Sequence, residues 1–341
     1  MISPKHLFDS WDYFKRGKGR RKDIQHFERH LEDQIFALHH DLKTSQYEHG
    51  PYHQFYVFDP KKRHISGACV RDRLVHQTLH SALSNIFDEK FIFHSLSSRH
   101  EKGMHLGISH LHRMIQKVSA NGRGTCFALK MDIRRFFDTI DHWTLKKLIS
   151  KNLKDEKVLA LIDIIINSFK TAQDFLSPRG IPLGNITSQL FANIYLHELD
   201  IFIKHHLRQK YYLRYCDDFI LLSDDEQYLR DLIPVIEQFL KVHLRLELHP
   251  QKIILRKLSQ GIDFVGHVLF QKYQLIRTTT KQRMQRRLRE AYASYLEEKI
   301  TPEAMDQKLH SYLGLLSHAN QHTLSQALQN AYGTRHHFDE L

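Results

Sequence analysis

The chain has 341 residues, of which 41% are hydrophobic, so it can bury a substantial core divided among two or three subdomains. Fifty Lys and Arg against 38 Asp and Glu leave a formal charge of +12, and the expected partner is therefore a polyanion, either nucleic acid or an anionic membrane. No apolar run approaches the roughly 20 residues of a membrane span, and the N-terminus lacks the apolar stretch of a signal peptide, which indicates a cytoplasmic protein.

Cysteine and histidine usage bears on metal binding. The three cysteines lie far apart and form no CxxC pair, which supports neither a disulfide framework nor a cysteine-based zinc finger. His105, His110 and His112 fall in one helical pattern without acidic or cysteine neighbours, so we interpret them as surface or groove residues rather than zinc ligands.

The first 60 residues read as an extension with a basic cluster that is either a phosphate-contacting arm or a solvated loop: Lys15, Arg16, Lys18, Arg20, Arg21 and Lys22. A strand is predicted from Phe55 to Phe58. A helix is predicted from Val70 to Phe87, because apolar residues recur there with helical spacing at Val70, Leu74, Val75, Leu79, Leu83 and Phe87.

The middle of the chain alternates strands and helices. Cys126 to Met131 predicts a buried strand that ends at Asp132, and Asp141 is placed to cap the next helix. A further helix is expected from about Asp155 to Phe169. The Gly/Pro loop Pro178 to Gly184 then runs into Ser188 and an amphipathic helix with apolar Leu190, Phe191, Ile194, Tyr195, Leu199 and Phe202.

Two short strands, Tyr211 to Tyr215 and Phe219 to Leu222, flank Cys216, Asp217 and Asp218. From about Tyr273 the pattern loses strand character and becomes helical, with core positions Met284, Leu288, Tyr292 and Tyr295.

Three carboxylates carry the chemical prediction. A strand ending in Asp132 beside a hairpin with Asp217 and Asp218 at its turn would gather them at one sheet edge, a costly repulsion unless cations bind there. Two divalent cations held in this way are what nucleotidyl transfer requires. Alone, paired aspartates two residues after a tyrosine are a weak signal, because Asp-Asp at a turn is usually only solvated.

The ordered set of motifs is far more specific. It comprises Asp132-Ile-Arg-Arg-Phe-Phe137-Asp, Leu183-Gly184-Asn-Ile-Thr-Ser188-Gln189, Tyr215-Cys216-Asp217-Asp218, Lys252 and Gly261-Ile-Asp-Phe-Val-Gly266. In this order and spacing the chain resembles the reverse transcriptase family. The resemblance implies an α+β right-hand polymerase fold. Its expected parts are an N-terminal extension (1–60), fingers (61–126 and 145–180), a palm with an antiparallel sheet (127–144 and 181–270) and a helical thumb with a short tail (271–341).

The resemblance also assigns residue roles. Asp132 and Asp217 become the principal ligands of two Mg²⁺ ions, for which Mn²⁺ is a possible substitute, and Asp218 a weaker ligand. Phe137 matches the aromatic gate beneath the incoming sugar, whereas Phe136 is read as an ordinary core residue. Leu183, Gly184, Ser188 and Gln189 match the loop and helix start against template and nucleotide, with the Ser188 hydroxyl capping the helix.

Basic and hairpin residues complete the implied site. Lys252 matches a lysine near the leaving pyrophosphate, and Arg63 and Arg71 match fingers positions that grip the triphosphate. The hairpin around Phe264, Val265 and Gly266 resembles a primer grip. The helix after Thr280 resembles a thumb that contacts the nucleic-acid backbone through Lys281, Arg283, Arg286 and Arg287. The implied partners are an RNA template, a DNA or RNA primer and dNTPs.

Two departures from the family pattern point to a subclass. Most members carry Gln-Gly where this chain has Leu183-Gly184, and Ser-Pro where it has Ser188-Gln189. Together with Val70-Arg-Asp-Arg-Leu-Val, Ser98-Arg-His-Glu-Lys-Gly-Met-His105 and Ser311-Tyr-Leu-Gly-Leu, they resemble the reverse transcriptases of diversity-generating retroelements. That class copies a template-repeat RNA with errors at template adenines, usually with a small basic accessory protein.

Our hypothesis is that Leu183 contributes to this relaxed selection, because an aliphatic side chain cannot offer the nucleotide the hydrogen bonds of a glutamine. A packing role for Leu183 is the alternative. Two other readings of the whole chain stay open. One is a retron or phage-defence reverse transcriptase, and the other is an RNA-binding, splicing-assistance protein that keeps the fold without polymerase activity.

Overall fold

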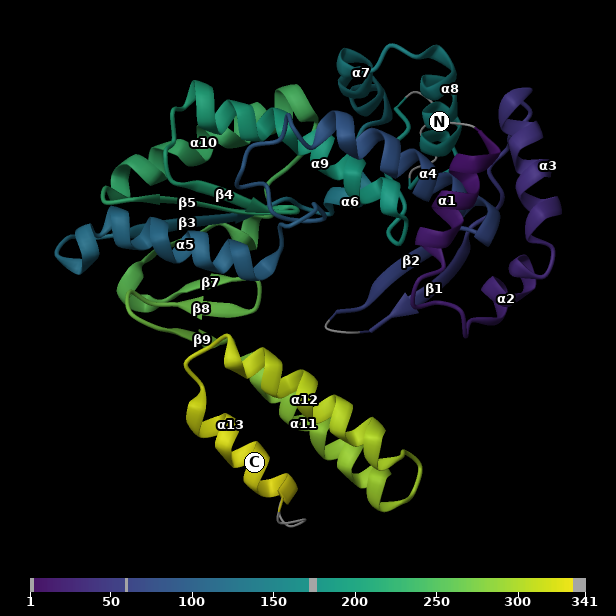
Figure 1. Cartoon of the computed structure of the whole chain (residues 1–341). Helices are drawn as coiled ribbons and strands as arrows, with labels where there is room; N and C mark the ends of the chain where they lie inside the picture. The colour runs from purple at the N-terminus through teal and green to yellow at the C-terminus, as the bar shows by residue number, and fades with distance from the viewer. Residues whose placement is uncertain (1–2, 59–60, 172–176, 334–341) are drawn as a thin grey trace. The chain divides into compact units, whose positions relative to one another are not determined.

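The computed structural model describes residues 3–58, 61–171 and 177–333 (Figure 1). The chain forms two compact units. The first comprises Met1–Lys102, Met131–Phe219 and Leu232–Ile253, and the second comprises Gly103–Lys130, Ile220–Asp231 and Ile254–Leu341. No helix within the described ranges is both long and apolar enough to cross a membrane.

The N-terminal part of the first unit is mainly helical. Its elements are α1 (Pro4–Phe14), α2 (Lys22–Glu28), α3 (Leu31–Lys43), β1 (His53–Val57), β2 (Arg63–Gly67) and α4 (Val70–Phe87). Strands β1 and β2 pair antiparallel from His53↔Gly67 to Val57↔Arg63. Helix α4 has exactly the predicted bounds, and all six of its predicted apolar positions are buried. These side chains form the core between α4 and its neighbours α1 and α9.

The rest of the first unit carries α6 (Phe136–Thr139), α7 (His142–Asn152), α8 (Glu156–Asn167), α9 (Ile186–Ile201), the π-helical turn η2 (Phe202–His206), β4 (Tyr212–Tyr215) and η3 (Pro250–Lys252). Asp141 caps α7 as predicted, since its Oδ1 accepts a hydrogen bond from the Thr144 amide at 2.9 Å. Asp155 caps α8 in the same way. Helix α9 is buried on nearly every side, so the prediction that it is amphipathic was wrong.

Three elements run through the boundaries between the units: β3 (Phe127–Asp132), β5 (Asp218–Ser223) and α10 (Glu226–Leu244). The sheet to which β3 and β5 belong has the strand order β4-β5-β3-β6. Strand β3 is the buried strand predicted to end at Asp132, and it pairs antiparallel with β6 from Phe127↔Lys257 to Lys130↔Ile254.

The second unit adds α5 (Met104–Val118), η1 (Ala120–Gly122), β6 (Ile254–Lys257), η4 (Leu258–Gln260), β7 (Ile262–Phe264), β8 (His267–Leu269), β9 (Gln274–Ile276), α11 (Thr278–Leu296), α12 (Pro302–Ser317) and α13 (His322–Gly333). Strands β7, β8 and β9 form an antiparallel sheet in sequence order. The prediction that strand character ends at about Tyr273 was wrong, because β9 pairs with β8 through Leu269↔Gln274. Three residues are too few for a periodic signal.

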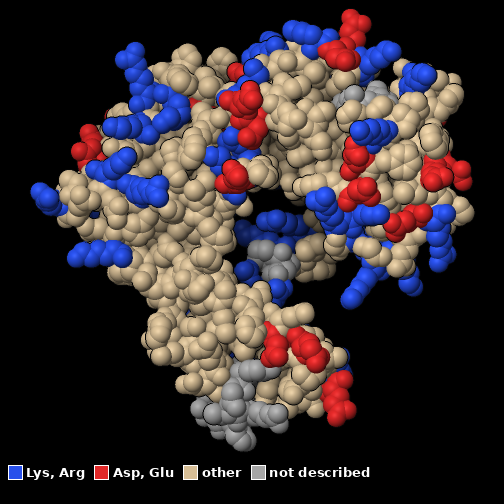
Figure 2. Space-filling model, viewed as in Figure 1, with Lys and Arg blue, Asp and Glu red and all other residues tan. Residues whose placement is uncertain are grey.

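Helices α11 and α12 lie side by side, and α13 contacts α12 (Figure 1). Their shared core contains the predicted Met284 and Leu288, while Tyr292 and Tyr295 pack against it half-buried. Lys and Arg side chains are spread over both units among Asp and Glu in the face shown in Figure 2.

Candidate active site

Asp132 is fixed where β3 ends. Its backbone carbonyl accepts a hydrogen bond from the His249 amide at 2.8 Å, and its side chain is mostly buried. The Lys252 ammonium lies 2.7 Å from Asp132 Oδ1, so two residues predicted to share the site are in contact. The lysine is the last residue of η3, which places its cation next to the carboxylate at the end of β3.

Asp217 lies in the tight turn between β4 and β5. Cys216, the other residue of the turn, has φ +57°, an unusual conformation for a residue with a side chain. The Asp217 carbonyl accepts a hydrogen bond from the Ile133 amide at 3.2 Å, and this contact brings the turn against the end of β3. Asp218 is the first residue of β5 and is half-buried, so its predicted role as a weaker ligand stays a prediction.

The two carboxylates influence each other electrostatically. Burial, and next the negative charge of Asp132, raise the pKa of Asp217, whereas Lys252 acts in the opposite direction. Burial raises the pKa of the Cys216 thiol to about 12, so this cysteine is not a thiolate at neutral pH. A site that holds two neighbouring carboxylates at this cost is relieved when a cation binds.

The donor set fits Mg²⁺, because this ion prefers hard oxygen ligands and is usually held by one or two carboxylates, with water and phosphate completing its shell. The sequence predicted that three carboxylates gather at this edge. In the described part of the chain, no group of three or more His, Cys, Asp or Glu side chains is arranged to hold a metal ion. Asp132 and Asp217, whose charges act on each other, would hold such an ion, and the weaker role of Asp218 stays a prediction.

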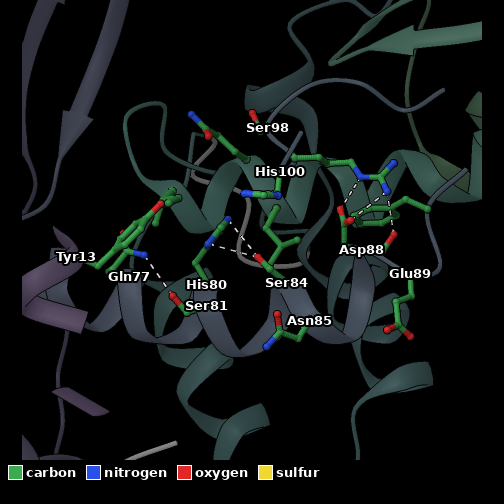
Figure 3. A pocket seen from close by; sticks show the side chains of 15 residues that line it. Tyr13, Gln77, His80, Ser81, Ser84, Asn85, Asp88, Glu89, Ser98 and His100 are labelled. Atoms are coloured by element: carbon green, nitrogen blue, oxygen red, sulfur yellow. Dashed lines mark hydrogen bonds and ion pairs between the residues drawn. The ribbon is translucent and has the colours of Figure 1, made fainter. Parts of the chain in front are cut away.

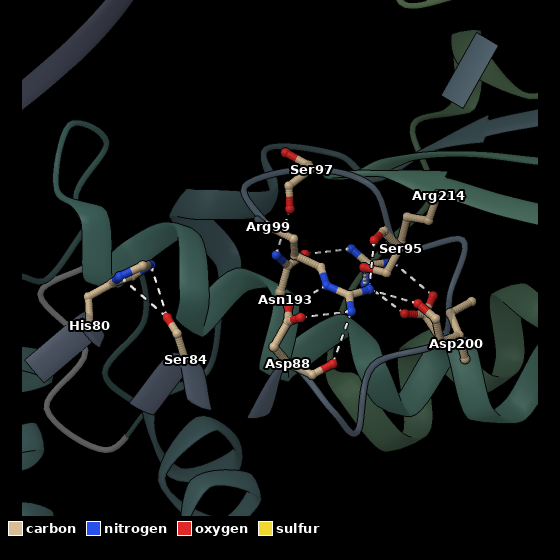
Figure 4. Close-up of polar contacts among 10 residues, drawn as sticks. His80, Ser84, Asp88, Ser95, Ser97, Arg99, Asn193, Asp200 and Arg214 are labelled. Atoms are coloured by element: carbon tan, nitrogen blue, oxygen red, sulfur yellow. Dashed lines mark hydrogen bonds and ion pairs between the residues drawn. The ribbon is translucent and has the colours of Figure 1, made fainter. Parts of the chain in front are cut away.

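A buried arginine supports the aspartate turn from behind, and sequence reasoning missed it. Arg214 on β4 is fully buried and makes a bidentate ion pair with Asp200, at 2.8 and 2.6 Å (Figure 4). Its Nη1 also donates to the Cys216 carbonyl at 3.0 Å and to Asn193 Oδ1 at 3.1 Å. Ser95 Oγ accepts from its Nη2 at 2.9 Å. This charged network thus holds the backbone of Cys216, the residue at positive φ next to Asp217.

Although burial opposes the charge, the Asp200 carboxylate raises the pKa of Arg214, which stays charged. A second arginine in Figure 4, Arg99, donates to both carboxylate oxygens of Asp88, at 2.5 and 3.2 Å, and to the carbonyls of Ile92 and Ser95. In each cluster the ion pair joins residues more than ten positions apart, and the separation between Ser95 and Arg214 is 119. A separation of that size leaves no local sequence signal.

The two phenylalanines after Asp132 differ in burial. Phe136 is buried, which confirms its place in the core, and Phe137 is half-buried with its ring 5.5 Å from that of Phe136. Arg135 precedes them in the left-handed conformation (φ +47°) and is the N-cap residue of α6. The role of Phe137 as a gate stays a prediction.

The segment Leu183–Ser188, a short loop that runs into the first turn of α9 and is called the Leu183–Ser188 loop below, is hydrogen-bonded to β2. The Leu183 carbonyl accepts from the Ser66 amide at 2.9 Å. Gly184 has φ +119°, and a Cβ there would lie 2.8 Å from Ile65 Cγ2, so this position requires glycine. The prediction that Ser188 caps the helix was wrong. Helix α9 begins at Ile186 after Asn185, and Ser188 is buried within its first turn.

Gln189, Arg63 and Arg71 were also predicted to bind the nucleotide, and their surroundings differ from one another. Gln189 is exposed and lines a pocket of about 870 Å³ along the polar face of α4, with Gln77, His80, Ser81, Ser84 and Asn85 (Figure 3). Arg63 is exposed on β2, whereas Arg71 pairs with Asp41 at 2.6 Å and donates to the Glu48 carbonyl. Arg71 would have to leave these partners to grip a triphosphate.

The second unit holds the predicted primer-grip and backbone residues. Strands β7 and β8 form a hairpin as expected, with Val265 and Gly266 both at positive φ in its two-residue turn. Phe264 is fully buried, so only the turn residues can reach a ligand. On α11, Arg286 and Arg287 are exposed, while Lys281 and Arg283 are half-buried.

Comparison with known proteins identifies the family. A model described as reverse transcriptase (RNA-dependent DNA polymerase) matches residues 58–269, which is more than half of the chain. The chain belongs to the reverse transcriptase family. The matched segment contains Asp132, Asp217, Asp218 and Lys252, as well as the loop Leu183–Ser188.

Proteins of similar sequence include Protein YkfC of Escherichia coli, 22% identical over 70% of this chain and 72% of its own length. The group II intron-encoded protein LtrA of Lactococcus lactis subsp. cremoris is 29% identical over 50% of this chain. An uncharacterized 91 kDa protein in the cob intron of Schizosaccharomyces pombe is 28% identical over 50% of it. The chain spans only 28% and 21% of the length of these last two.

Among solved structures, telomerase from Candida albicans, in complex with a TWJ fragment of telomeric RNA, aligns with a TM-score of 0.50 and 15% identity. The alignment covers 80% of this chain and 56% of that one. Telomerase from Candida Tropicalis aligns with a TM-score of 0.50 and 13% identity, over 89% of this chain and 58% of that one. At these identities the likeness concerns the fold alone, and it confirms the predicted right-hand polymerase fold.

Proposed function

We propose that this reverse transcriptase copies an RNA template into cDNA by two-metal nucleotidyl transfer. The observation that carries the proposal is the backbone hydrogen bond from the Ile133 amide to the Asp217 carbonyl, which brings Asp217 to the end of β3 beside Asp132. Burial, and next the charge of Asp132, raise the pKa of Asp217. A purely RNA-binding protein has no need of this electrostatic cost, so the splicing-assistance alternative is less favoured.

The residues divide the work in the following way. Asp132 and Asp217 would hold two Mg²⁺ ions, with Asp218 as a weaker ligand; such ions activate a primer 3′-hydroxyl and neutralise triphosphate charge when bound. Lys252 changes partner from Asp132 to the charge that develops on the departing pyrophosphate. Phe137 excludes a 2′-hydroxyl, and Leu183, Gly184 and Ser188 lie against the nascent base pair.

The template class is the finer part of the proposal. Leu183-Gly184 and Ser188-Gln189 support a diversity-generating retroelement enzyme that makes errors at template adenines and works with a small basic accessory protein. A second candidate is an intron-associated enzyme, since two of the relatives are named as an intron-encoded protein and a protein in an intron. Neither class changes the chemistry expected at Asp132 and Asp217.

The test is primer extension on an RNA template with Mg²⁺ and single dNTPs, followed by sequencing of the products. The native chain should extend the primer, and Asp217→Asn, which removes the charge but keeps the shape, should lower the rate by at least about a thousandfold. Asp231→Asn, an exposed aspartate on α10, is the matched control and should retain native activity.

The outcomes separate the candidates. Errors concentrated opposite template adenines favour the diversity-generating class, and even error rates favour the intron-associated one. An absence of extension, with and without a candidate accessory protein, would reject polymerase activity and leave the RNA-binding alternative.

A further inference from the structure

A buried chain of hydrogen bonds links the segment before β1 to the first turn of α9. Thr187 Oγ1 lies 2.6 Å from His76 Nδ1, and His76 Nε2 lies 3.1 Å from His49 Nε2. His49 Nδ1 lies 2.6 Å from the Gly50 carbonyl oxygen. The side chains of His49, His76 and Thr187 are almost completely buried, so water does not compete for these contacts.

The chemistry of the end groups fixes the direction of this chain. A carbonyl only accepts, so His49 Nδ1 carries a hydrogen and, in a neutral ring, its Nε2 is an acceptor. His76 Nε2 must then donate, which leaves His76 Nδ1 as an acceptor for the Thr187 hydroxyl. With both rings neutral, one assignment of protons satisfies all three contacts, and it requires a hydroxyl at residue 187.

The end of this hydrogen-bond series at Gly50 is held by Asp72. Asp72 is fully buried and accepts hydrogen bonds from the Gly50 amide at 2.9 Å, the Tyr47 hydroxyl at 2.9 Å and the Cys69 thiol at 3.2 Å. Tyr52 lies against the His49 ring, with the ring centroids 4.7 Å apart. Asp72 and His76 are one turn apart on α4. The series of hydrogen bonds therefore starts at Asp72 on this helix, passes through Gly50 and His49, returns to the helix at His76 and ends at Thr187 on α9.

The other end of the hydrogen-bond series, at Thr187, adjoins the Leu183–Ser188 loop, which is predicted to contact the incoming nucleotide. Thr187 directly precedes Ser188 and follows Gly184 by three residues. The start of the loop is held by the Leu183–Ser66 backbone hydrogen bond, whereas Thr187 anchors its end through His76. Between these two anchors, Asn185 Nδ2 reaches the Ser66 carbonyl at 3.4 Å, a weak contact.

We propose that His49, His76 and Thr187 are positioning residues of the polymerase, which set the place of the Leu183–Ser188 loop against the incoming nucleotide. The proposal rests on the proposed role of that loop in nucleotide binding. None of the three residues touches the nucleotide, and their effect passes through the first turn of α9.

A loop that loses one anchor samples more conformations and pays more to order around a nucleotide. The expected signature is a raised KM for dNTP with a smaller change in kcat and an unchanged Kd for primer–template. Thr187→Val keeps the shape but removes the hydroxyl, and it should raise the KM by about tenfold, roughly what one hydrogen bond to an otherwise unpaired buried group contributes. Thr187→Ser keeps the hydroxyl and should stay within about threefold of native.

A second pair of variants tests His76, in the middle of the hydrogen-bond series. A glutamine at residue 76 offers both an N–H donor and a carbonyl acceptor, as the neutral imidazole offers a donor and an acceptor, whereas a methionine of similar length offers neither donor nor comparable acceptor. His76→Gln should therefore preserve the dNTP KM better than His76→Met. Rescue by the amide is an effect that loss of packing alone does not produce.

Single-nucleotide incorporation kinetics, primer–template binding and thermal unfolding of the four variants decide the matter. Equal dNTP KM values for Thr187→Val and Thr187→Ser would overturn the proposal. Failure of Thr187→Val to fold would also overturn it, since the hydroxyl would then serve the whole fold rather than the loop. If the native chain itself does not extend a primer, the proposed function has failed, which is distinct from either of these results.

Discussion

At the scale of single residues, the site depends on charges that are buried and paired. Arg214 and Asp200 are both almost inaccessible to water, and each satisfies several hydrogen-bonding groups of the other and of its neighbours. Such a pair adds little net stability over a well-packed apolar pair, but removal of one member leaves the other charge without compensation. The position of the Cys216 carbonyl depends on the same guanidinium.

Asp200→Asn should therefore lower the free energy of unfolding by about 3–5 kcal/mol and reduce polymerase activity, because it leaves a buried guanidinium unpaired. The exposed pair Arg230–Glu226 provides the control, and Glu226→Gln should change stability by no more than about 0.5 kcal/mol. Urea titration of both variants measures the difference. Equal losses would mean that Arg214 does not depend on Asp200.

His76 should make stability depend on pH. Burial, reinforced by His49, lowers the pKa of His76 to about 3 against the opposing effect of Asp72, so the folded ring stays neutral where the unfolded ring binds a proton. Stability is therefore lost as pH falls below about 6.5, and the loss reaches about 2 kcal/mol by pH 5. His76→Gln should show a stability change between about pH 7.5 and 5 that is smaller by this amount.

Leu183 carries the prediction about copying errors. If its aliphatic side chain relaxes nucleotide selection, Leu183→Gln should lower misincorporation opposite template adenine severalfold while extension elsewhere is maintained. Sequencing of cDNA from a defined RNA template measures this. Unchanged misincorporation at adenine would refute the hypothesis and favour a packing role for the side chain.

At the scale of secondary-structure elements, the sequence predicted those parts whose pattern is local. Helix α4 and strand β3 follow directly from periodicity and from buried runs, and Asp141 from capping chemistry. The beginning of α9 at Ile186 could not be read from the sequence, because Asn185 precedes it without a side-chain cap. The link from His76 to Thr187 spans 111 residues, so only the folded chain reveals it.

The loop before α9 imposes a strict requirement at Gly184. Gly184→Ala should cost about 1–3 kcal/mol, since alanine tolerates neither the backbone conformation nor the approach of Ile65. Gly314 in α12 has no neighbouring atoms where a Cβ would be placed, so Gly314→Ala should be neutral or should stabilise by up to about 1 kcal/mol. Thermal unfolding of the two variants provides the comparison, and equal destabilisation would contradict it.

At the scale of the whole molecule, the charge of +12 matters more than any single contact. Binding of primer–template should weaken steeply with salt, because each neutralised phosphate releases counterions. Arg286→Gln and Arg287→Gln should each reduce the slope of log K against log salt by about one unit and affect all sequences alike. Lys299→Gln, at a residue beyond the end of α11, is the control and should leave the slope unchanged.

The backbone hydrogen bond between Ser66 and Leu183 bears on how the copying errors of this enzyme could be altered by substitution. The Ser66 amide donates to the backbone carbonyl of Leu183, a contact that any side chain at residue 183 leaves available. The half-buried side chain can be exchanged through a series of sizes and polarities while the main chain keeps its course. If Leu183 takes part in nucleotide selection, substitutions at this single position would give a set of enzymes with graded error spectra.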